Sequence, residues 1–311
     1  SLSNDGKDVF EISSKKGKPF IQRSSSSALT SGIGWYLNHY ARVNLSWNNL
    51  TTDLSKVNLP VPQAVERREC SAVYRYYLNY CTYSYSMAFW TRERWEQEID
   101  WMALHGINIP LALVGTDVVW KNVLAEAGYK REDIDKFVAG PGFQAWWLMN
   151  NLEGWGGTEP GKLNGGTWEG AGGVQDDAWY ERQFSLARKI VQRQRELGIH
   201  PVLPGFSGMV PTNFTEKTGV PTDANGGRWA GGFQRPRIID PTYGGFAQIA
   251  ADYYACLKEV MGESQYYSMD PFHEGGSISS GKYAEAYQAI FDAMEEAREG
   301  AKWVIQQWQW S

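Results

Sequence analysis

The first 66 residues contain two short segments in which apolar and polar residues alternate, followed by one segment with helical spacing. The alternating segments are "DVFEISS" and "PFIQRS", and a turn at residues 16–18 separates them. Alternation with a period of two residues predicts two half-buried strands. In "SSALTSGIGWYLNHY", Leu29, Ile33 and Leu37 recur at helical spacing behind serines that can cap a helix. The stretch "NLPVPQAVE" carries two prolines and indicates a linker, so we expect a small α/β domain over residues 1–66.

Beyond residue 66, apolar segments of strand length alternate with amphipathic helical segments. The expected strands are residues 73–86, 107–114, 200–206, 266–270 and 303–310. The expected helices are residues 91–106, 117–126, 176–198, 246–261 and 281–299. Strands of nearly continuous apolar sequence, separated by helices, are typical of a parallel sheet that helices cover. We therefore expect residues 67–311 to form the N-terminal part of a (β/α)8 barrel of the TIM type.

The number of expected strands bears on this interpretation. Five strands are expected after residue 66, whereas a closed barrel of this type has eight. An open doubly wound sheet would need fewer strands, but "CTYSYSMAFW" follows the first expected strand where that fold would place a G-x-G-x-x-G turn. We therefore expect an incomplete barrel, whose remaining strands and any further domain are absent from these 311 residues.

Charge and composition exclude several classes of function. The net charge is −5, and lysine and arginine are scattered, so we expect no nucleic-acid partner. No apolar run approaches the roughly 18 residues of a membrane span. Three cysteines and four histidines lie too far apart to indicate a disulfide framework, a metal site or a cofactor. The oligomeric state is left open.

Aromatic residues are abundant, with 15 tryptophans and 17 tyrosines. Several tryptophans lie beside glycines, where they either stack on sugar rings or fill a large core. Residues 153–173 contain nine glycines and two tryptophans, which is typical of a long loop that serves a site. On the short helix before this loop, we expect one of Trp146 and Trp147 to pack inward and the other to face a cleft.

In a barrel, catalytic side chains come from the loops that follow the C-terminal ends of the strands. The residues at these positions are Asn79, Cys81, Tyr85, Asp117, Phe206, Ser207, Asp270, His273, Glu274 and Trp308. Glu274 follows a strand within "MDPFHEGG" and lies among aromatic residues. Such surroundings disfavour an ionised carboxylate, which suits an acid that donates a proton to a glycosidic oxygen. We therefore predict that Glu274 is a general acid.

Several segments together resemble the α-N-acetylglucosaminidases of glycoside hydrolase family 89. The similar motifs are "YRYYLNYCTYSYS" with "RWEQEIDWMALHGIN", then "GPGFQAW" with "NL", "PVLPGF", "RW" with "GF", and "MDPFHEGG". The resemblance covers nearly the whole chain. It implies a small N-terminal α/β domain, a (β/α)8 barrel and a helical C-terminal domain. It also implies an enzyme that removes terminal α-linked N-acetylglucosamine from glycans with retention of configuration.

The resemblance implies roles for individual residues as well. Glu274 corresponds to the acid/base of the family, and His273 stands where the lysosomal relatives have asparagine. The substrate pocket of the family corresponds to Asn79, Cys81, Tyr85, Trp146, Trp229 and Trp308. The nucleophilic glutamate of the family falls beyond residue 311. Because retaining hydrolysis needs two carboxyl groups about 5–5.5 Å apart, we expect this chain alone to be catalytically incomplete.

Other polar residues have simpler interpretations. For His273, three roles are open: it orients Glu274, it contacts a sugar hydroxyl, or it donates a hydrogen bond to a backbone carbonyl. Asp117 precedes an apolar helix and is interpreted as its N-cap. Glu153 has no evident partner, and Asp270 is expected to hold its own loop or His273.

Two further expectations concern the segment around the first barrel strand. Cys81 is expected to shape the pocket, since nothing nearby in sequence lowers the pKa of its thiol. The aromatic stripe of Tyr74, Tyr76 and Tyr80 is expected to belong to the core.

Two other functions stay open. A carbohydrate-binding protein would keep the aromatic cleft and not need Glu274. An enzyme that uses phosphate or a nucleotide would need a phosphate-binding glycine loop, and the sequence contains none. The aglycone, of the heparan or the mucin type, is not determined. Such glycans lie outside the cytoplasm, so we expect an extracytoplasmic protein, exported by a bacterium or lysosomal in a eukaryote.

Overall fold

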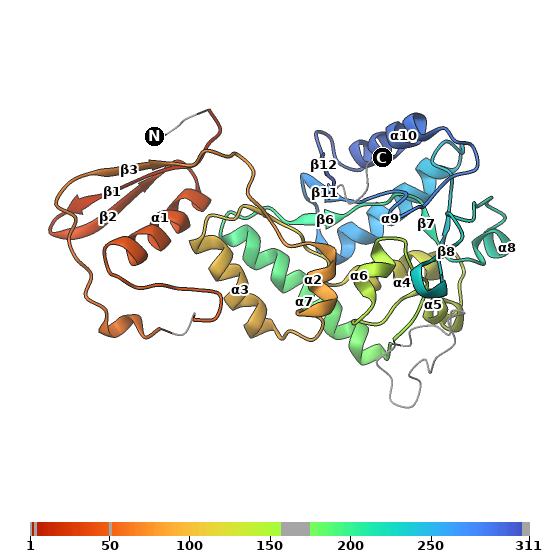
Figure 1. Ribbon diagram of the computed structural model, residues 1–311, viewed down its shortest axis with the longest axis horizontal. Helices are drawn as coiled ribbons and strands as arrows, with labels where there is room; N and C mark the ends of the chain where they lie inside the picture. Colours follow the sequence, from red (N-terminus) through yellow and green to blue (C-terminus); the bar gives the residue numbers. More distant parts are fainter. Residues whose placement is uncertain (1, 3–4, 50–51, 157–174, 307–311) are drawn as a thin grey trace. The chain divides into compact units, whose positions relative to one another are not determined.

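A computed structural model describes residues 2, 5–49, 52–156 and 175–306 (Figure 1). The chain divides into two compact units. Unit 1 consists of Ser1–Tyr77, Trp90–Pro110 and Lys189–Pro201, and unit 2 of Leu78–Phe89, Leu111–Arg188 and Val202–Ser311. Among the described residues, no helix is both long and apolar enough to cross a membrane.

Unit 1 contains a three-stranded antiparallel sheet with the strand order β2-β1-β3. The strands are β1 (Val9–Lys15), β2 (Lys18–Arg23) and β3 (Glu66–Glu69), and helix α1 (Ser26–His39) follows β2. Phe10 and Ile12 of β1 pack against Tyr36 of α1. The two predicted strands and the helix are therefore confirmed. Strand β3 was not predicted, because its sequence "ERRE" has no apolar residue.

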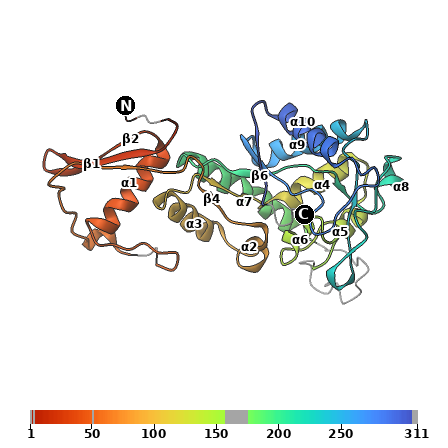
Figure 2. The same cartoon turned by 45° about the horizontal axis from the view of Figure 1, so that its top comes forward.

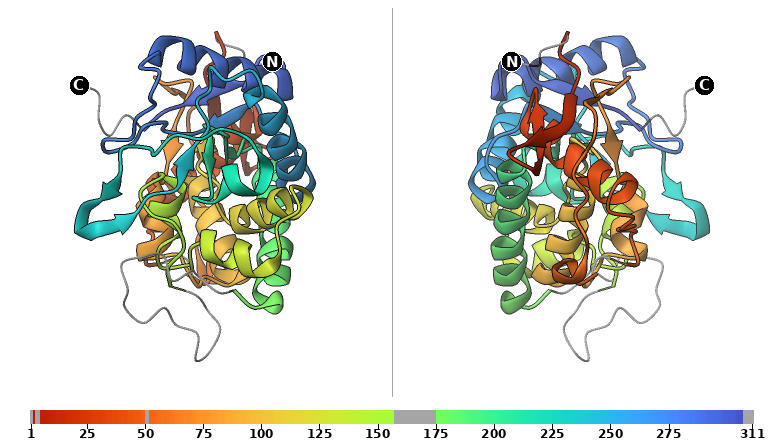
Figure 3. Two further views of the ribbon diagram at one scale, coloured as in Figure 1. Left: turned by 90° about the vertical axis from the view of Figure 1, so that its right-hand side faces the viewer. Right: turned by 90° about the vertical axis from the view of Figure 1, so that its left-hand side faces the viewer.

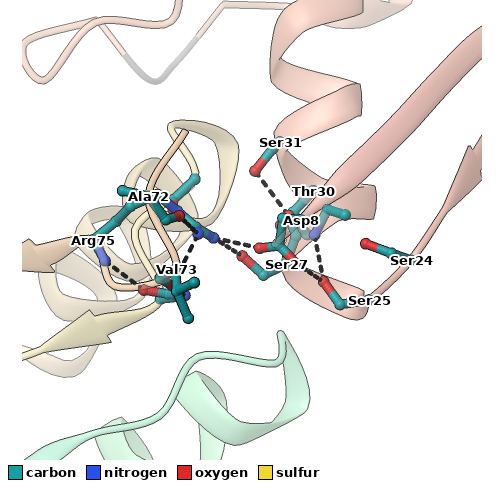
Figure 4. A network of polar contacts seen from close by, with 12 residues as sticks. Asp8, Ser24, Ser25, Ser27, Thr30, Ser31, Ala72, Val73 and Arg75 are labelled. Carbon is teal, nitrogen blue, oxygen red and sulfur yellow. Dashed lines mark hydrogen bonds and ion pairs between the residues drawn. The ribbon is translucent and has the colours of Figure 1, made fainter. Parts of the chain in front are cut away.

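A polar network in unit 1 connects the start of β1 to the residues that lead into the barrel segment (Figure 4). The guanidinium group of Arg75 forms an ion pair with Asp8 and donates a hydrogen bond to Ser27 Oγ, 3.1 Å away. Arg75 also donates to the carbonyl oxygens of Ala72 and Val73, at 2.9 and 3.2 Å. These bonds hold residues 72–75 immediately before strand β4 (Tyr76–Tyr77), which pairs in parallel with β5 (Ile109–Pro110). Helix α3 (Arg92–Leu104) lies between these two strands in the sequence.

Unit 2 contains a parallel sheet with the strand order β12-β11-β6. Its strands are β6 (Val202–Pro204), β11 (Tyr266–Ser268) and β12 (Lys302–Val304). Leu111, the residue after β5, pairs in parallel with Val202 and so continues this order. Helices α4 (Thr116–Glu126), α9 (Phe246–Met261) and α10 (Tyr283–Ala297) separate the strands in the sequence. Helix α9 packs against both α4 and α10 (Figure 2), as the predicted alternation of strand and helix requires.

Unit 2 also contains several short helices and strands. They are helices α2 (Tyr80–Tyr85), α5 (Arg131–Phe137), α6 (Gln144–Leu148) and α8 (Phe214–Thr218), the pair β7 (Met209–Val210) and β10 (Arg237–Ile238), and the hairpin β8 (Arg228–Trp229) with β9 (Phe233–Gln234). Helix α7 (Asp177–Glu196) begins in unit 2 and ends in unit 1. The β8–β9 hairpin lies on the opposite side of unit 2 from α9 (Figure 3).

The prediction of one long strand over residues 73–86 is wrong. Only Tyr76–Tyr77 is a strand, and helix α2 begins at Tyr80. The side chain of Asn79 causes the change, because its Oδ1 accepts a hydrogen bond from the Thr82 N–H and caps the helix. The aromatic stripe is therefore not a core stripe. Tyr80 is 3% exposed, but Tyr74 is 50% exposed and Tyr76 is 36% exposed.

Candidate active site

Glu274 lies in the turn that follows strand β11, at the C-terminal end of a parallel strand. Three residues of this turn, Phe272, Glu274 and Gly275, have left-handed backbone conformations, with φ of +61°, +47° and +88°. A residue with a side chain pays about 1 kcal/mol or more for this conformation. Such strain concentrates at functional sites, where surrounding contacts hold the backbone in place.

Among the described residues, two side chains donate hydrogen bonds to one carboxylate oxygen of Glu274. The indole Nε1–H of Trp229 donates to Oε2 at 2.5 Å, and the amide Nδ2–H of Asn151 donates to the same atom at 3.1 Å. The structure therefore brings Glu274 together with Trp229, which the resemblance placed in the pocket. Asn151 was assigned no role from the sequence. The sequence did contain an indication of its importance, because Asn151 is the first residue of the "NL" segment, one of the motifs that resemble family 89.

His273 is buried beside the same amide group. Its Nδ1 lies 3.2 Å from Oδ1 of Asn151, so His273 contacts Glu274 indirectly, through the side chain of Asn151. Burial lowers the pKa of His273, which the negative charge of Glu274 only partly offsets. The imidazole is therefore neutral around pH 7.

Arg235 is a second residue that the sequence analysis missed. Its guanidinium group is buried and donates to the carbonyl oxygens of Glu274, His273 and Asn150, at 2.5, 3.1 and 3.2 Å. Burial lowers the pKa of this guanidinium group. The segment "FQRPRI" resembles an ordinary surface loop, and no sequence pattern marks its first arginine as buried.

The predicted pocket residues on helix α2 occupy different environments. The side-chain oxygen Oδ1 of Asn79 accepts hydrogen bonds from the backbone N–H and the hydroxyl of Thr82, at 3.0 and 2.8 Å. Cys81 is half-buried, and burial together with the charge of Glu274 raises the pKa of its thiol. Cys81 therefore lies within electrostatic range of Glu274 and is not a thiolate nucleophile. Tyr85 is 76% exposed.

Trp146 and Trp147 on helix α6 point in different directions. Trp147 is fully buried and contacts the rings of Trp120 and Phe137, which confirms the expected inward ring. Trp146 is half-buried, and its ring meets that of Tyr85 edge-on at a centroid distance of 5.2 Å. Trp308 lies outside the described residues.

Among the described residues of unit 2, the buried carboxyl groups are those of Asp117 and Glu153. Asp117 is not the N-cap, as had been predicted, because Gly115 takes that position. Its Oδ2 accepts the indole N–H of Trp179 at 2.8 Å, and burial raises its pKa to about 6. Glu153 does have a partner, contrary to the prediction. The backbone N–H and hydroxyl of Thr212 donate to it at 3.1 and 3.0 Å, and burial raises its pKa to about 8.

The side chain of Asp270 bonds a residue of another segment. Its Oδ1 accepts a hydrogen bond from the backbone N–H of Gln306 at 3.0 Å, which ties the start of the Glu274 turn to the residues after β12. Within the described ranges, no group of three or more His, Cys, Asp or Glu side chains is arranged to hold a metal ion.

Comparison with known proteins matches both parts of the chain to one family. The family model "Alpha-N-acetylglucosaminidase (NAGLU) tim-barrel domain" matches residues 75–311, and "Alpha-N-acetylglucosaminidase (NAGLU) N-terminal domain" matches residues 1–61. These matches confirm the predicted fold class, an N-terminal α/β domain followed by a TIM-type barrel domain. A human protein named "Alpha-N-acetylglucosaminidase" is 30% identical over 297 residues, which are 93% of this chain and 37% of the human protein.

Solved structures agree with this assignment. A family 89 glycoside hydrolase from Clostridium perfringens, in complex with 2-acetamido-1,2-dideoxynojirmycin, has a TM-score of 0.84 and 34% identity. The match covers 99% of this chain and 34% of that protein. A Clostridium perfringens variant with two glutamates changed to glutamine, in complex with GlcNAc-alpha-1,4-galactose, has a TM-score of 0.83 and 34% identity, and the match covers 98% of this chain and 33% of that one. The chain thus spans about a third of the length of these relatives, and it belongs to the α-N-acetylglucosaminidase family, glycoside hydrolase family 89.

Proposed function

We propose that the protein is a glycoside hydrolase that removes terminal α-linked N-acetylglucosamine from glycans, with Glu274 as its general acid/base. The observation that carries the proposal is the carboxylate of Glu274, held by Trp229 and Asn151 at the C-terminal end of a parallel strand. In barrel enzymes, catalytic groups lie at this end of the strands. The relatives bound to an N-acetylglucosamine-like compound and to GlcNAc-alpha-1,4-galactose support this substrate class.

The mechanism that we propose retains the anomeric configuration. Glu274 protonates the departing glycosidic oxygen while a second carboxylate attacks the anomeric carbon, and Glu274 then deprotonates the water that releases the sugar. Asp117 and Glu153 are poor candidates for the nucleophile, because Trp179 and Thr212 already hold their carboxyl groups. We keep the prediction that a glutamate beyond residue 311 attacks.

The remaining residues would bind the sugar. The half-buried ring of Trp146, with the exposed Tyr85 beside it, offers an apolar face to the C–H groups of a pyranose. The ring of Trp229 also offers an apolar face to the sugar, while its indole N–H donates a hydrogen bond to Glu274. The protonated thiol of Cys81 shapes the pocket, and Trp308 stays a predicted pocket residue. Because such glycans lie outside the cytoplasm, we propose an extracytoplasmic location.

The test measures release of 4-nitrophenol from 4-nitrophenyl α-N-acetylglucosaminide. It compares the 311-residue chain with the same chain joined to the remaining part of the Clostridium perfringens relative. We expect activity in the joined form, a loss of about 10²–10⁴-fold in Glu274→Gln, and no change in Glu285→Gln, which alters an exposed glutamate of α10. Cleavage by the 311-residue chain alone would show that the nucleophile lies within it.

A second assay separates an acid/base from other roles of Glu274. A 2,4-dinitrophenyl leaving group departs without protonation, so the first step should survive in Glu274→Gln. Added azide should then release the sugar as an α-glycosyl azide, since azide needs no general base. Equal inactivity of the variant on both substrates, with no azide product, would refute the assignment. Sugar binding without any hydrolysis would favour a carbohydrate-binding protein.

A further inference from the structure

Arg235 is buried against the turn that carries Glu274, with an exposed fraction of only 2%. Within the part of the chain that the structure describes, it forms four hydrogen bonds, all to neutral oxygen atoms. Three acceptors are the backbone carbonyl groups of Glu274, His273 and Asn150, and the fourth is Oδ1 of Asn151, 3.4 Å from Nη1. Burying a guanidinium group is costly, and these bonds offset the cost while they hold the left-handed turn.

The bond to Asn151 decides which end of its amide group faces Glu274. A guanidinium group can only donate hydrogen bonds, so the atom of Asn151 that faces Arg235 must be the carbonyl oxygen. The Nδ1 atom of His273 lies 3.2 Å from the same oxygen, so once Arg235 fixes that atom as the carbonyl oxygen, the neutral imidazole carries its proton on Nδ1 and donates to it. The NH₂ group of Asn151 is therefore turned toward Glu274, where it lies 3.1 Å from Oε2.

With the amide fixed, Oε2 of Glu274 receives two N–H donors, from Asn151 and from Trp229. A proton on Oε2 would point at these hydrogens, so the acid form carries its proton on Oε1. We infer that Arg235 is a positioning residue, which orients Asn151 and so places the transferable proton of Glu274 on Oε1. This inference rests on the proposed function for its catalytic consequence, but the orientation itself can be measured without catalysis.

The proton transfer follows directly from this geometry. The Oε1–H bond of Glu274 breaks as a new O–H bond forms on the glycosidic oxygen. The bond between that oxygen and the anomeric carbon breaks, and its electron pair stays on the departing oxygen, while the second carboxylate of the proposed mechanism forms a bond to the anomeric carbon. Glu274 is left as a carboxylate, and its charge is stabilised by the two N–H donors already bound to Oε2.

The first test uses NMR on the 311-residue chain and needs no activity. The side-chain NH₂ signals of Asn151 and the indole N–H signal of Trp229 should both change with pH in step with ionisation of Glu274, and not in Glu274→Gln. In Arg235→Met, the Asn151 signals should lose this response. The matched control is Arg237→Met, because Arg237 bonds Thr222 instead. An unchanged response of Asn151 in Arg235→Met would overturn the inference.

The second test uses the joined, active form and compares two leaving groups. We expect Arg235→Met to lower kcat/KM about 10²-fold for a disaccharide, whose departing alcohol needs the proton, and less than about 10-fold for the 2,4-dinitrophenyl glycoside. Arg235→Lys should recover part of the loss, and Asn151→Leu should show the same split. Equal losses on both substrates would mean that Arg235 is merely structural. If no form cleaves any glycoside, the proposed function fails, while NMR still decides the orientation.

Discussion

The substitution Glu153→Gln tests whether burial controls the ionisation of a carboxyl group near the site. Glu153 is 8% exposed, and burial raises its pKa from 4.5 to about 8, although Thr212 donates two hydrogen bonds to it. Between these two pKa values, the folded state holds a proton that the unfolded state has lost. The stability of the native chain therefore falls as the pH rises from about 5 to 8.

The size of this effect follows from the change in pKa. At about 1.4 kcal/mol per pH unit, a rise from 4.5 to about 8 corresponds to about 5 kcal/mol of stability, present below pH 4.5 and lost by pH 8. Glutamine has nearly the same shape and accepts a hydrogen bond from Thr212, but it does not ionise. Glu153→Gln should therefore remove this part of the pH dependence.

The assay is urea unfolding of both chains at pH 5, 6, 7 and 8. The free energy of unfolding of Glu153→Gln, relative to the native chain, should rise by about 1.4 kcal/mol for each pH unit. The control Glu285→Gln changes an exposed glutamate and should show a difference that does not depend on pH in this way. A difference between Glu153→Gln and the native chain that stays constant from pH 5 to 8 would refute the reasoning.

Two further substitutions test other contacts in unit 2. Trp179→Phe removes the indole donor of buried Asp117, whose pKa is about 6, so we expect a loss of about 1–3 kcal/mol at pH 7.5 and a smaller loss at pH 5, measured by urea unfolding. Equal losses at both pH values would contradict this. Gly226→Ala places a methyl group against the carbonyl oxygen of Gly275, whereas at Gly227, which also has a positive φ, a methyl group meets no atom within 4 Å. Thermal unfolding should therefore show that Gly227→Ala lowers the free energy of unfolding by about 1 kcal/mol and that Gly226→Ala lowers it clearly more. Similar losses for the two variants would show that the backbone around Gly275 moves to make room for the methyl group.

The elements with strong periodicity could be predicted closely. The helix expected at residues 246–261 is the observed α9, because its apolar residues repeat at helical spacing and Gly262 ends it. Residues 73–86 were predicted incorrectly, because aromatic residues indicate a strand while a single polar side chain, Asn79, starts a helix. Local sequence alone does not weigh one capping hydrogen bond against a run of tyrosines.

The sequence by itself determined the fold class and the family, and it was enough to predict Glu274 as the general acid, because hydrophobic periodicity and contiguous motifs are local properties of the chain. Only the tertiary structure brought Asn151 and Trp229 to that carboxylate, and Arg235 to the backbone carbonyl of the same residue, from positions 39 to 123 residues away in the sequence. The same is true of Glu153, whose pKa depends on burial by segments distant in sequence. Hydrogen-bond direction and desolvation arise from atoms that meet only in the folded protein, so no local pattern encodes them.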